Sequence, residues 1–461
     1  MKAIKDVIKN LPLNANQIST DPEIIKVYGK DWTTYFDIHA SAVIFPESTN
    51  DVSKIVKWAV LEKVSLVPSG GRTGLSGGAC ALNYEVVVSF DKMNQLTDFN
   101  SIENSVRCQA GVITEQLQNY AKSKNLFYPV DFAARGSSQI GGNIATNAGG
   151  IKVLRYGLTR DWITSLTVVT GTGEILELNK SLIKNATGYD LRHLFIGSEG
   201  TLGFITEATI QLTTPPPTLE VLLLSCENLS QVIETFKLFN SKTKICAFEM
   251  ISDKAMLKVL DSTQLPNPFT AIHPFYIVVE IEKASEEESL KNQQTLEEAF
   301  SLGFVTDGLI AQSDQQAKNF WRYREDISES LAKHSPYKND ISVRISFITE
   351  FIAELEKIIH NHYPDWTVVW FGHVGDGNLH LNILRPPGLS KEEFVKECQK
   401  VDVEIFTVIK KFQGSISAEH GVGLTKRNFL NFTRSPEEIQ ILKQIKNIFD
   451  PHGIINPGKL I

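Results

Sequence analysis

Glycine is concentrated in three stretches of the first half of this chain, and they restrict its possible folds more than any other feature. The stretches are PSGGRTGLSGG (residues 68–78), GSSQIGGNIATNAGGIKVLRYG (136–157) and GSEGTLGFIT (197–206). Such loops leave backbone N–H groups free to converge on one anion. They match neither GxGxxG after a first strand nor GxxxxGK followed by Ser or Thr, so no Rossmann site or NTPase phosphate loop is predicted. Each stretch alone could be a set of tight turns, but together they favour one extended cofactor that contains a pyrophosphate.

Strand and helix patterns alternate around these stretches. SAVIFPES (41–48) predicts a strand, DVSKIVKWAVLEK (51–63) a helix capped by Asp51, and VSLVPSGG (64–71) a strand that enters a turn. The consecutive prolines of TTPPP (213–217) end the alternation, because they fit neither a helix interior nor a central strand. Beyond them, VLLLSC, LSQVIETFKLFN, ICAFEMI and FYIVVEIE predict an antiparallel sheet with helices on one face.

Two short stretches near the C-terminus hold the residues of a metal centre with a base beside it. GHVGDGNLH contains His373 and His380, and SAEHGVG contains Glu419 and His420. Imidazole and carboxylate suit zinc or a similar divalent ion, and three protein ligands leave a coordination position for substrate. We therefore expect His373, His380 and Glu419 as ligands and His420 as a proton-transfer group. The alternative is a glycine-rich turn with hydrogen-bonded core histidines.

The glycines between the two histidines argue against a helix. A strand fits better, because His380 and Asn382 would then face the same way on an extended segment. His373 would precede a tight Gly-Asp-Gly-Asn turn that folds back toward them.

Composition limits the class of protein. The 461 residues are 42% hydrophobic and 21% charged, which is typical of a globular chain of two or three domains, and the net charge of −7 argues against a nucleic-acid partner. Neither a secretory signal nor a run of about 18 apolar residues is found, so no transmembrane segment is expected, and the expected location is the cytoplasm, or the mitochondrial matrix for a eukaryotic source. The cysteines lack CxxC spacing and predict neither a disulfide framework nor a thiolate metal site: Cys80, Cys108, Cys226, Cys246 and Cys398.

The three glycine-rich stretches resemble the flavin-binding domain of the vanillyl-alcohol-oxidase-type, or PCMH-type, flavoproteins, and so does PVDFAAR, which directly precedes the second stretch. GHVGDGNLHLN and SAEHGVGLTKR resemble the C-terminal domain of their D-2-hydroxyacid dehydrogenase branch. This branch includes D-lactate dehydrogenases, the glycolate oxidase flavin subunit and, most similar here, D-2-hydroxyglutarate dehydrogenases. The resemblance extends from about residue 40 to the closing NPGK.

The resemblance implies an α+β fold, in which a two-part PCMH-type FAD-binding domain precedes an antiparallel-sheet substrate (cap) domain. We expect an N-terminal helical segment (1–37), the FAD-binding domain (38–217), the cap domain (218–425) and a helical C-terminal segment that returns to the FAD domain (426–461).

The cofactor implied by the resemblance is FAD. Some relatives attach the flavin covalently through a histidine of the first loop, where this chain has Arg72, so non-covalent FAD is expected. The implied cofactor-binding residues are Pro68, Gly70, Gly71, Arg72, Thr73, Gly74, Asp131, Ser137, Gly141, Gly142, Thr146, Gly150, Glu199, Gly200 and Ile205.

A substrate with two carboxylates is implied by the segment 320–346. Arg324, Ser328 and Lys338 fall on positions that bind the distal carboxylate in D-2-hydroxyglutarate dehydrogenases, and Asn382 is expected to join them. Relatives that act on lactate or glycolate typically lack this lysine. From spacing alone, Arg324 on its helix would instead be a solvated partner of a nearby glutamate. Charge-assisted hydrogen bonds from two cations suit a dicarboxylate, so D-2-hydroxyglutarate, or D-malate, is the expected substrate.

The expected reaction gives the 2-oxo acid, with hydride passing to flavin N5 and His420 as the base. The expected metal is Zn, with Mn as the alternative. No nicotinamide site is found, so the expected electron acceptor is an electron-transfer flavoprotein or a quinone, and oxygen is also open. A homodimer is one of the assemblies that the sequence leaves open. One departure from the family is Arg344, which replaces a usual proline.

Three alternatives remain at this point. The chain could be a D-lactate or glycolate dehydrogenase, or a flavin subunit that needs partner chains. Alkyl-glycerone-phosphate synthases share the flavin domain, but their run of successive histidines is missing here.

Overall fold

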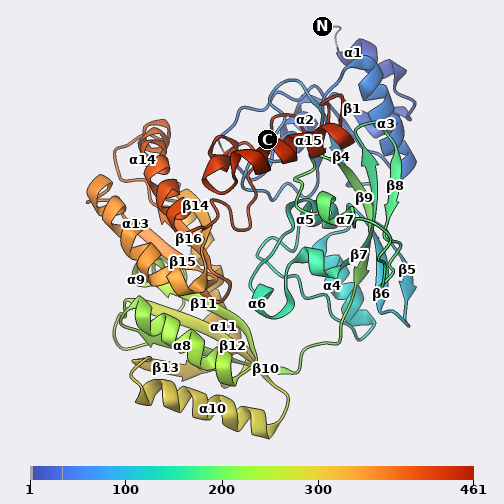
Figure 1. Ribbon diagram of the computed structural model, residues 1–461. Helices are drawn as coiled ribbons and strands as arrows, with labels where there is room; N and C mark the ends of the chain where they lie inside the picture. Colours follow the sequence, from blue (N-terminus) through green and yellow to red (C-terminus); the bar gives the residue numbers. More distant parts are fainter. Residues whose placement is uncertain (1–3, 34) are drawn as a thin grey trace. The chain divides into compact units, whose positions relative to one another are not determined.

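The computed structural model describes residues 4–33 and 35–461 as two compact units (Figure 1). The first unit contains the described residues up to Gly150, together with Gly157–Pro215 and Glu419–Ile461. The second contains Ile151–Tyr156 and Pro216–Ala418. The chain therefore crosses between the units four times, namely after Gly150, after Tyr156, at the prolines of TTPPP and within SAEHGVG. Residues 1–3 and 34 of the expected N-terminal helical segment lie outside the described part of the chain.

The first unit begins with a small four-stranded sheet in the order β1-β2-β4-β3. β2, β4 and β3 are parallel, and β1 pairs antiparallel with β2. The helix α3 connects β2 to β3 and buries its apolar side in the core of this sheet. These elements, with the further helices α1 and α2, are in chain order α1 (Ile4–Val7), β1 (Ile18–Ser19), α2 (Pro22–Tyr28), β2 (Ala42–Ile44), α3 (Thr49–Glu62), β3 (Leu66–Ser69) and β4 (Val86–Ser89).

The cap of α3 differs from the expectation. The N-cap is Ser48, whose side chain accepts a hydrogen bond from the N–H of Asp51, so the prediction of Asp51 as the cap is wrong. The carboxylate of Asp51 instead accepts hydrogen bonds from the N–H of Glu47 and the side chain of Gln17. The helix begins earlier because Ser48 is itself a preferred capping residue in extended geometry.

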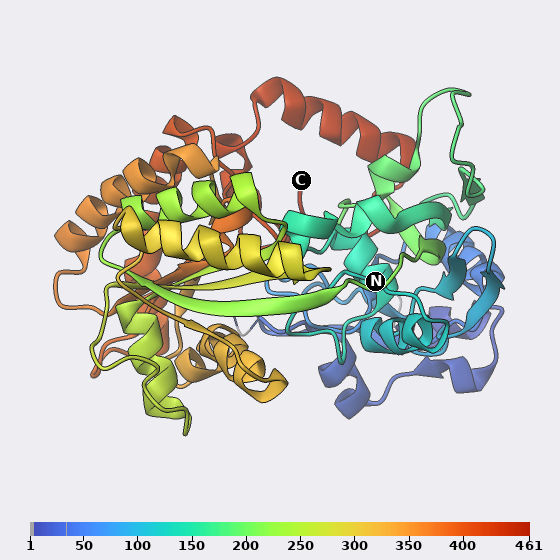
Figure 2. The ribbon, with the colours of Figure 1, turned by 90° about the horizontal axis from the view of Figure 1, so that it is seen from below.

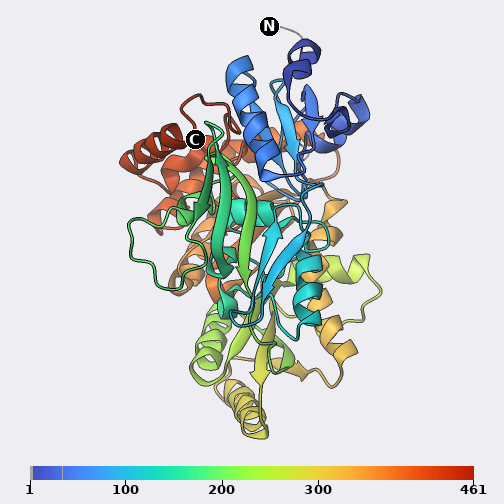
Figure 3. The same ribbon diagram turned by 90° about the vertical axis from the view of Figure 1, so that its right-hand side faces the viewer.

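The second sheet of the first unit is antiparallel, with five strands in the order β5-β6-β9-β7-β8 (Figure 3). α4 and α5 bury apolar side chains in its core. The elements are β5 (Leu96–Asn100), β6 (Ser105–Gln109), α4 (Thr114–Ser123), α5 (Ile140–Thr146), β7 (Ile163–Thr170), β8 (Ile175–Leu178), α7 (Arg192–Phe195) and β9 (Gly203–Gln211).

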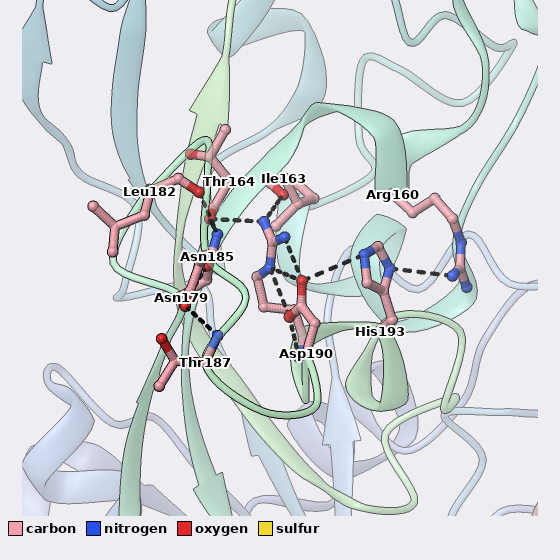
Figure 4. A network of polar contacts seen from close by, with 10 residues as sticks. Arg160, Ile163, Thr164, Asn179, Leu182, Asn185, Thr187, Asp190 and His193 are labelled. Carbon is pink, nitrogen blue, oxygen red and sulfur yellow. Dashed lines mark hydrogen bonds and ion pairs between the residues drawn. The ribbon is translucent and has the colours of Figure 1, made fainter.

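A polar network holds the loop between β8 and β9, which leads into the third glycine stretch (Figure 4). Arg192 donates to the carboxylate of Asp190 and to the backbone carbonyls of Ile163 and Thr164. Asn179 also donates to the carbonyl of Thr164. The loop is therefore tied to the start of β7, which fixes the entry of the chain into residues 197–206.

The C-terminal segment of the chain belongs to the first unit. It contains α15 (Pro436–Phe449), after which Ile455 pairs with Leu66 of β3. The side chain of Asn456 donates to the carbonyls of Gly78 and Glu199. The closing residues therefore join two of the glycine stretches.

The second unit contains a seven-stranded sheet in the order β13-β10-β12-β11-β15-β16-β14, antiparallel throughout. Its strands are β10 (Thr218–Cys226), β11 (Ile245–Ser252), β12 (Phe275–Lys283), β13 (Asp307–Ile310), β14 (Tyr337–Ser342), β15 (Val368–Gly372) and β16 (Asn378–Ile383). Its helices are α6 (Val153–Tyr156), α8 (Leu229–Lys242), α9 (Asp253–Ser262), α10 (Glu286–Ser301), α11 (Asp314–Glu325), α12 (Ile327–Ala332), α13 (Ile348–His362) and α14 (Lys391–Lys411).

Helices cover both faces of this sheet, so the prediction of helices on one face is wrong (Figure 2). On β11, Phe248 packs against Phe236 of α8, whereas the next residue, Glu249, bonds Arg324 of α11. Neighbouring residues of a strand point to opposite faces. Every residue of β11 is accordingly buried, as in a sheet that is covered twice.

The short segment Ile151–Tyr156 packs on the sheet of the second unit, although its neighbours in the sequence belong to the first. Lys152 pairs with Glu280, and Arg155 Nε lies 2.7 Å from Glu282 Oε1, both acids being on β12. All five cysteines are buried free thiols. No helix among the described residues is both long and apolar enough to cross a membrane.

Candidate functional site

The glycine stretches of the first unit line one groove, whose space, including the part open to solvent, is about 940 Å³. Most of the residues predicted to bind the cofactor line it: Pro68, Gly70, Gly71, Arg72, Thr73, Gly74, Gly141, Gly142, Thr146, Glu199, Gly200 and Ile205. Asp131, Ser137 and Gly150 are not among the lining residues. Asp131 pairs with Arg135, and Gly150 packs on the carbonyl of Asp131.

Two glycines of the groove have different reasons to be glycine. A Cβ on Gly71 would lie 2.2 Å from the carbonyl oxygen of Ser137, so the first two glycine stretches touch here and leave no room for a side chain. A Cβ on Gly142 would meet nothing within 4 Å. Gly142 therefore lies beside open space, as expected for a position where a ligand approaches the backbone.

Two buried oxygen atoms of groove-lining residues have no hydrogen-bond partner among the described residues. They are Gln139 Oε1 and Asp31 Oδ2. The other ends of these side chains are engaged, since Gln139 Nε2 donates to Asp91 and Asp31 Oδ1 accepts from the N–H of Thr33. Buried acceptors are normally satisfied, so they call for a ligand that brings hydroxyl or N–H donors. FAD carries both on its ribityl, ribose and ring groups, and the groove therefore fits FAD.

Arg72 is held within the first loop. It adopts a left-handed backbone with φ of 59°, its guanidinium lies 4.3 Å from the ring centre of Tyr28, and Nη1 lies 3.6 Å from Asp91 Oδ1. Arg72 Nη1 also donates to the carbonyl of Gly70. The side chain at this position is thus part of the structure of the loop.

Glu199 fixes the loop that carries His420. Its two carboxylate oxygens accept from the N–H groups of Val422 and Gly423, each at 2.7 Å. Burial raises the pKa of Glu199 above its ordinary value, against the lowering effect of these two donors and of Lys426. His420 lines the groove, and its Nε2 lies 3.7 Å from Glu419 Oε1. The third glycine stretch therefore supports the loop of the predicted base.

The two predicted ligand histidines of the second unit lie side by side. They flank the turn of the β15–β16 hairpin, as the sequence predicted, with His380 on β16 and His373 just after β15. Their ring centres are 5.5 Å apart. The turn needs Gly377, because its φ is 86° and a Cβ there would lie 2.1 Å from the carbonyl of Val343.

Each of these histidines has a carboxylate at one ring nitrogen. His373 Nδ1 lies 2.7 Å from Glu249 Oε1, and His380 Nδ1 lies 3.8 Å from Asp340 Oδ1. All four side chains are buried. Metal-binding histidines typically carry such a second carboxylate partner, so this donor set fits a divalent metal.

The strand pairing of β14 with β16 brings the predicted substrate residues to these histidines. Lys338 lies opposite Asn382, and Asp340 lies opposite His380, so all four face the same side of the sheet. This confirms that His380 and Asn382 share a face. Burial lowers the pKa of Lys338 below its ordinary value.

Arg324 is buried, which excludes the interpretation of a solvated pair with a glutamate of its own helix. Its Nε donates to Glu249 Oε2 at 2.8 Å, and its guanidinium carbon lies 4.9 Å from the ring centre of Phe371. The helical stretch expected to join Arg324 to Ser328 is interrupted at Asp326, so Ser328 lies in the first turn of a separate helix, α12, and is exposed.

Arg344 is exposed and occupied elsewhere. Its Nη2 donates to Gln413, and its guanidinium carbon lies 5.5 Å from the ring centre of Phe347. The cation that replaces the usual proline is therefore engaged at the surface of the second unit.

Sequence reasoning missed Glu249, Gln139 and Asp31. Glu249 had a usable signal, since it is the only charged residue of the apolar strand ICAFEMI, and an acid there must find a buried partner. Gln139 lies inside the second glycine stretch, whereas nothing in the local sequence of Asp31 marks it.

Comparison with known proteins agrees with this geometry. The chain matches the family models "FAD binding domain" over residues 40–179 and "FAD linked oxidases, C-terminal domain" over residues 215–460. D-2-hydroxyglutarate dehydrogenase of Stutzerimonas stutzeri (strain A1501) is 52% identical over 458 residues, which cover 99% of this chain and 98% of that protein. The protein of that name from Xanthomonas citri pv. viticola is 48% identical, over 97% of this chain and 94% of that protein.

Two solved structures share the fold. A p-cresol methylhydroxylase with substrate bound matches with a TM-score of 0.79 and 14% identity, over 99% of this chain and 96% of that chain. An alkyldihydroxyacetonephosphate synthase matches with a TM-score of 0.73 and 18% identity, over 99% of this chain and 85% of that chain. Together with the two family models, these likenesses confirm the predicted α+β fold, with an FAD-binding domain followed by an antiparallel-sheet domain.

Proposed function

The chain belongs to the FAD-linked oxidase family, in its D-2-hydroxyacid dehydrogenase branch, and on that premise we propose that it oxidises D-2-hydroxyglutarate, or the related dicarboxylate D-malate, to the 2-oxo acid. The observation that carries the proposal is the register of β14 and β16. It sets Lys338 and Asn382 beside Asp340 and His380 on one face. A step of two residues along a strand is about 7 Å, the scale of a five-carbon diacid.

The chain supplies binding groups for both ends of this substrate. Lys338 and Arg324 hold the distal carboxylate, with Ser328 and Asn382 as further polar contacts. Two cations favour a dicarboxylate, because each charge-assisted hydrogen bond is worth about 1.5–3 kcal/mol. A monocarboxylate such as D-lactate gains nothing from them.

His420 accepts the proton of the substrate hydroxyl. It is positioned for this by the Glu199 carboxylate, which holds the loop at Val422 and Gly423 beside the cofactor groove. The imidazole must be neutral to act as a base.

The non-protein groups are held by residues that fit them. The glycine-lined groove would hold FAD non-covalently, and His373, His380 and Glu419 would hold Zn or Mn, the assignment of Glu419 resting on the sequence. When bound, FAD would supply the two-electron acceptor and the metal a Lewis acid toward the hydroxyl and carboxylate oxygens. An electron-transfer flavoprotein or a quinone would reoxidise the protein, and a homodimer is the proposed assembly.

A dye-linked assay of the purified holoprotein tests this proposal. D-2-hydroxyglutarate, D-malate, D-lactate, the L-isomers of these three acids and the achiral glycolate are compared with and without a chelator, and for Lys338→Met. We expect turnover of the D-dicarboxylates, loss with chelator and recovery with Zn or Mn. Lys338→Met should raise the KM for D-2-hydroxyglutarate at least tenfold more than that for D-lactate.

The matched control is Lys333→Met, which removes an exposed lysine from the same segment and should change neither KM. A preference for D-lactate or glycolate in the wild type would favour the alternative dehydrogenases. Equal effects of Lys338→Met on both substrates would contradict the role of the lysine.

A further inference from the structure

Glu249 bonds two residues that have separate roles in the proposed function. Its Oε1 lies 2.7 Å from His373 Nδ1, and its Oε2 accepts from Arg324 Nε at 2.8 Å. The residue is 1% exposed. Extending the β11–β15 register, in which Ile251 lies opposite Phe371, places Glu249 opposite His373. One carboxylate therefore contacts a predicted metal ligand with one oxygen and a predicted substrate-binding cation with the other.

The contacts of Glu249 differ from those of the other buried acids on the same sheet face. Glu280 and Glu282 of the neighbouring strand are also almost fully buried, but they pair with Lys152 and Arg155. Those pairs attach the segment Ile151–Tyr156 to the sheet. A buried ion pair is a weak source of net stability, because desolvating the charges offsets their attraction. Stability alone therefore does not explain why Glu249 meets His373 and Arg324 together.

We propose that Glu249 is a positioning residue that holds the metal-binding His373 and the carboxylate-binding Arg324 at a fixed separation. This role rests on the proposed function. A proton on His373 Nδ1 that is donated to Glu249 places the imidazole lone pair on Nε2, the atom that would bind the metal. The bond from Arg324 Nε fixes the plane of the guanidinium, and the ring of Phe371 supports its face.

The consequence is a coupling between metal affinity and substrate length. Because the same carboxylate orients both partners, a change at Glu249 disturbs the metal end and the distal-carboxylate end of the site together. Arg324→Met, in contrast, disturbs only the distal-carboxylate end of the site, because Glu249 still bonds His373. The two variants thus separate a shared positioning role from a role at one end.

The test compares Glu249→Gln with the matched control Glu282→Gln in the FAD holoprotein. Glutamine keeps the size of the side chain, but it replaces one of the two carboxylate oxygens by an NH2 group, which cannot accept a hydrogen bond from the partner on that side. We expect Glu249→Gln to weaken Zn binding, measured by competition with a chromophoric chelator, by about 10- to 100-fold. Its KM for D-2-hydroxyglutarate should rise about tenfold, and that for D-lactate by much less. Glu282→Gln also removes a buried charge but should leave the Zn affinity and both KM values near wild type.

The arginine arm completes the test. Arg324→Met should raise the KM for D-2-hydroxyglutarate and leave the Zn affinity unchanged, and adding Glu249→Gln to it should raise that KM little further. Should Glu249→Gln fold poorly, Glu249→Asp keeps the charge and retracts the carboxylate, so it should weaken Zn binding and D-2-hydroxyglutarate binding in the same direction.

Wild-type Zn affinity and KM in Glu249→Gln, or a loss of thermal stability only, would overturn the role of Glu249. Wild-type protein that binds Zn and oxidises D-2-hydroxyglutarate would in that case leave the proposed function standing. Wild-type protein that does neither would overturn both.

Discussion

Each unit of the molecule buries one glutamate beside its candidate site residues, and the two acids have opposite surroundings. Glu199 of the first unit accepts from two backbone N–H groups, and burial raises its pKa above the ordinary value. Glu249 of the second unit meets His373 and Arg324. Burial raises its pKa too, but these two partners outweigh that effect, and the pKa lies below the ordinary value.

Because their hydrogen-bond partners differ, the two acids fix different parts of the structure. Neutral backbone donors define the path of the main chain, so Glu199 sets the position of a loop, and through it the position of His420. Cationic side chains define orientations, so Glu249 sets the directions of an imidazole and a guanidinium. The site of the first unit should thus respond to changes in hydrogen-bond geometry, and that of the second to loss of charge.

The largest effect should come from the proposed base, His420, and from the proposed metal ligand His380. His420→Ala removes the proposed base and should lower turnover of D-2-hydroxyglutarate about 10²- to 10⁴-fold, with metal content near wild type. His380→Ala removes an imidazole ligand and should lose the metal. Turnover and bound metal are measured on the same preparations. Full turnover in either variant, or metal retained in His380→Ala, would contradict this division of roles.

A smaller effect is expected for Glu199→Gln. The amide can accept from only one of the N–H groups of Val422 and Gly423, and leaving the other unsatisfied costs about 1–3 kcal/mol of unfolding free energy. Because the loop of His420 is then held less firmly, kcat should fall while the KM for D-2-hydroxyglutarate changes little. Denaturant unfolding and steady-state kinetics measure the two quantities.

Glu199→Gln thereby contrasts with Glu249→Gln, for which the KM and the Zn affinity should change. A raised KM with unchanged kcat in Glu199→Gln would remove the distinction between the two acids.

Local sequence patterns predicted the parts of the site that depend on one segment. The strand that places His380 and Asn382 on one face is such a case, because alternation along a strand is a local property. The prediction of the N-cap of α3 also depended on one segment, but it was wrong. Ser48 and Asp51 are both good capping residues and lie three positions apart. Local rules could not choose between them.

The missed features depend on contacts between distant segments. Glu249 meets residues 75 and 124 positions away, and the segment Ile151–Tyr156 joins the second unit across a break in the sequence. The helices on both faces of the seven-stranded sheet could have been predicted from ICAFEMI. This strand is nearly all apolar instead of alternating, as strands that are buried on both sides are. Within this strand, Glu249 was the one local sign of the candidate site in the second unit.

The smallest effect concerns the pH dependence of substrate binding at Lys338. Burial lowers the pKa of this lysine below the ordinary 10.5. Its charge, and with it the attraction for a second carboxylate, is complete below that lowered pKa and is lost as the pH rises through it. The KM for D-2-hydroxyglutarate should therefore rise in the alkaline range, by up to about tenfold, while that for D-lactate stays level.

The ratio of the two KM values isolates Lys338, because any effect of pH that is common to both substrates cancels in it. Lys338→Arg serves as the control, since a guanidinium stays charged throughout this range and should flatten the ratio against pH. A ratio that is already flat in the wild type, or one that rises as steeply in Lys338→Arg, would show that the charge of residue 338 does not select the dicarboxylate. The sensitivity to charge assigned to the second unit would then rest on Glu249 and Arg324 alone.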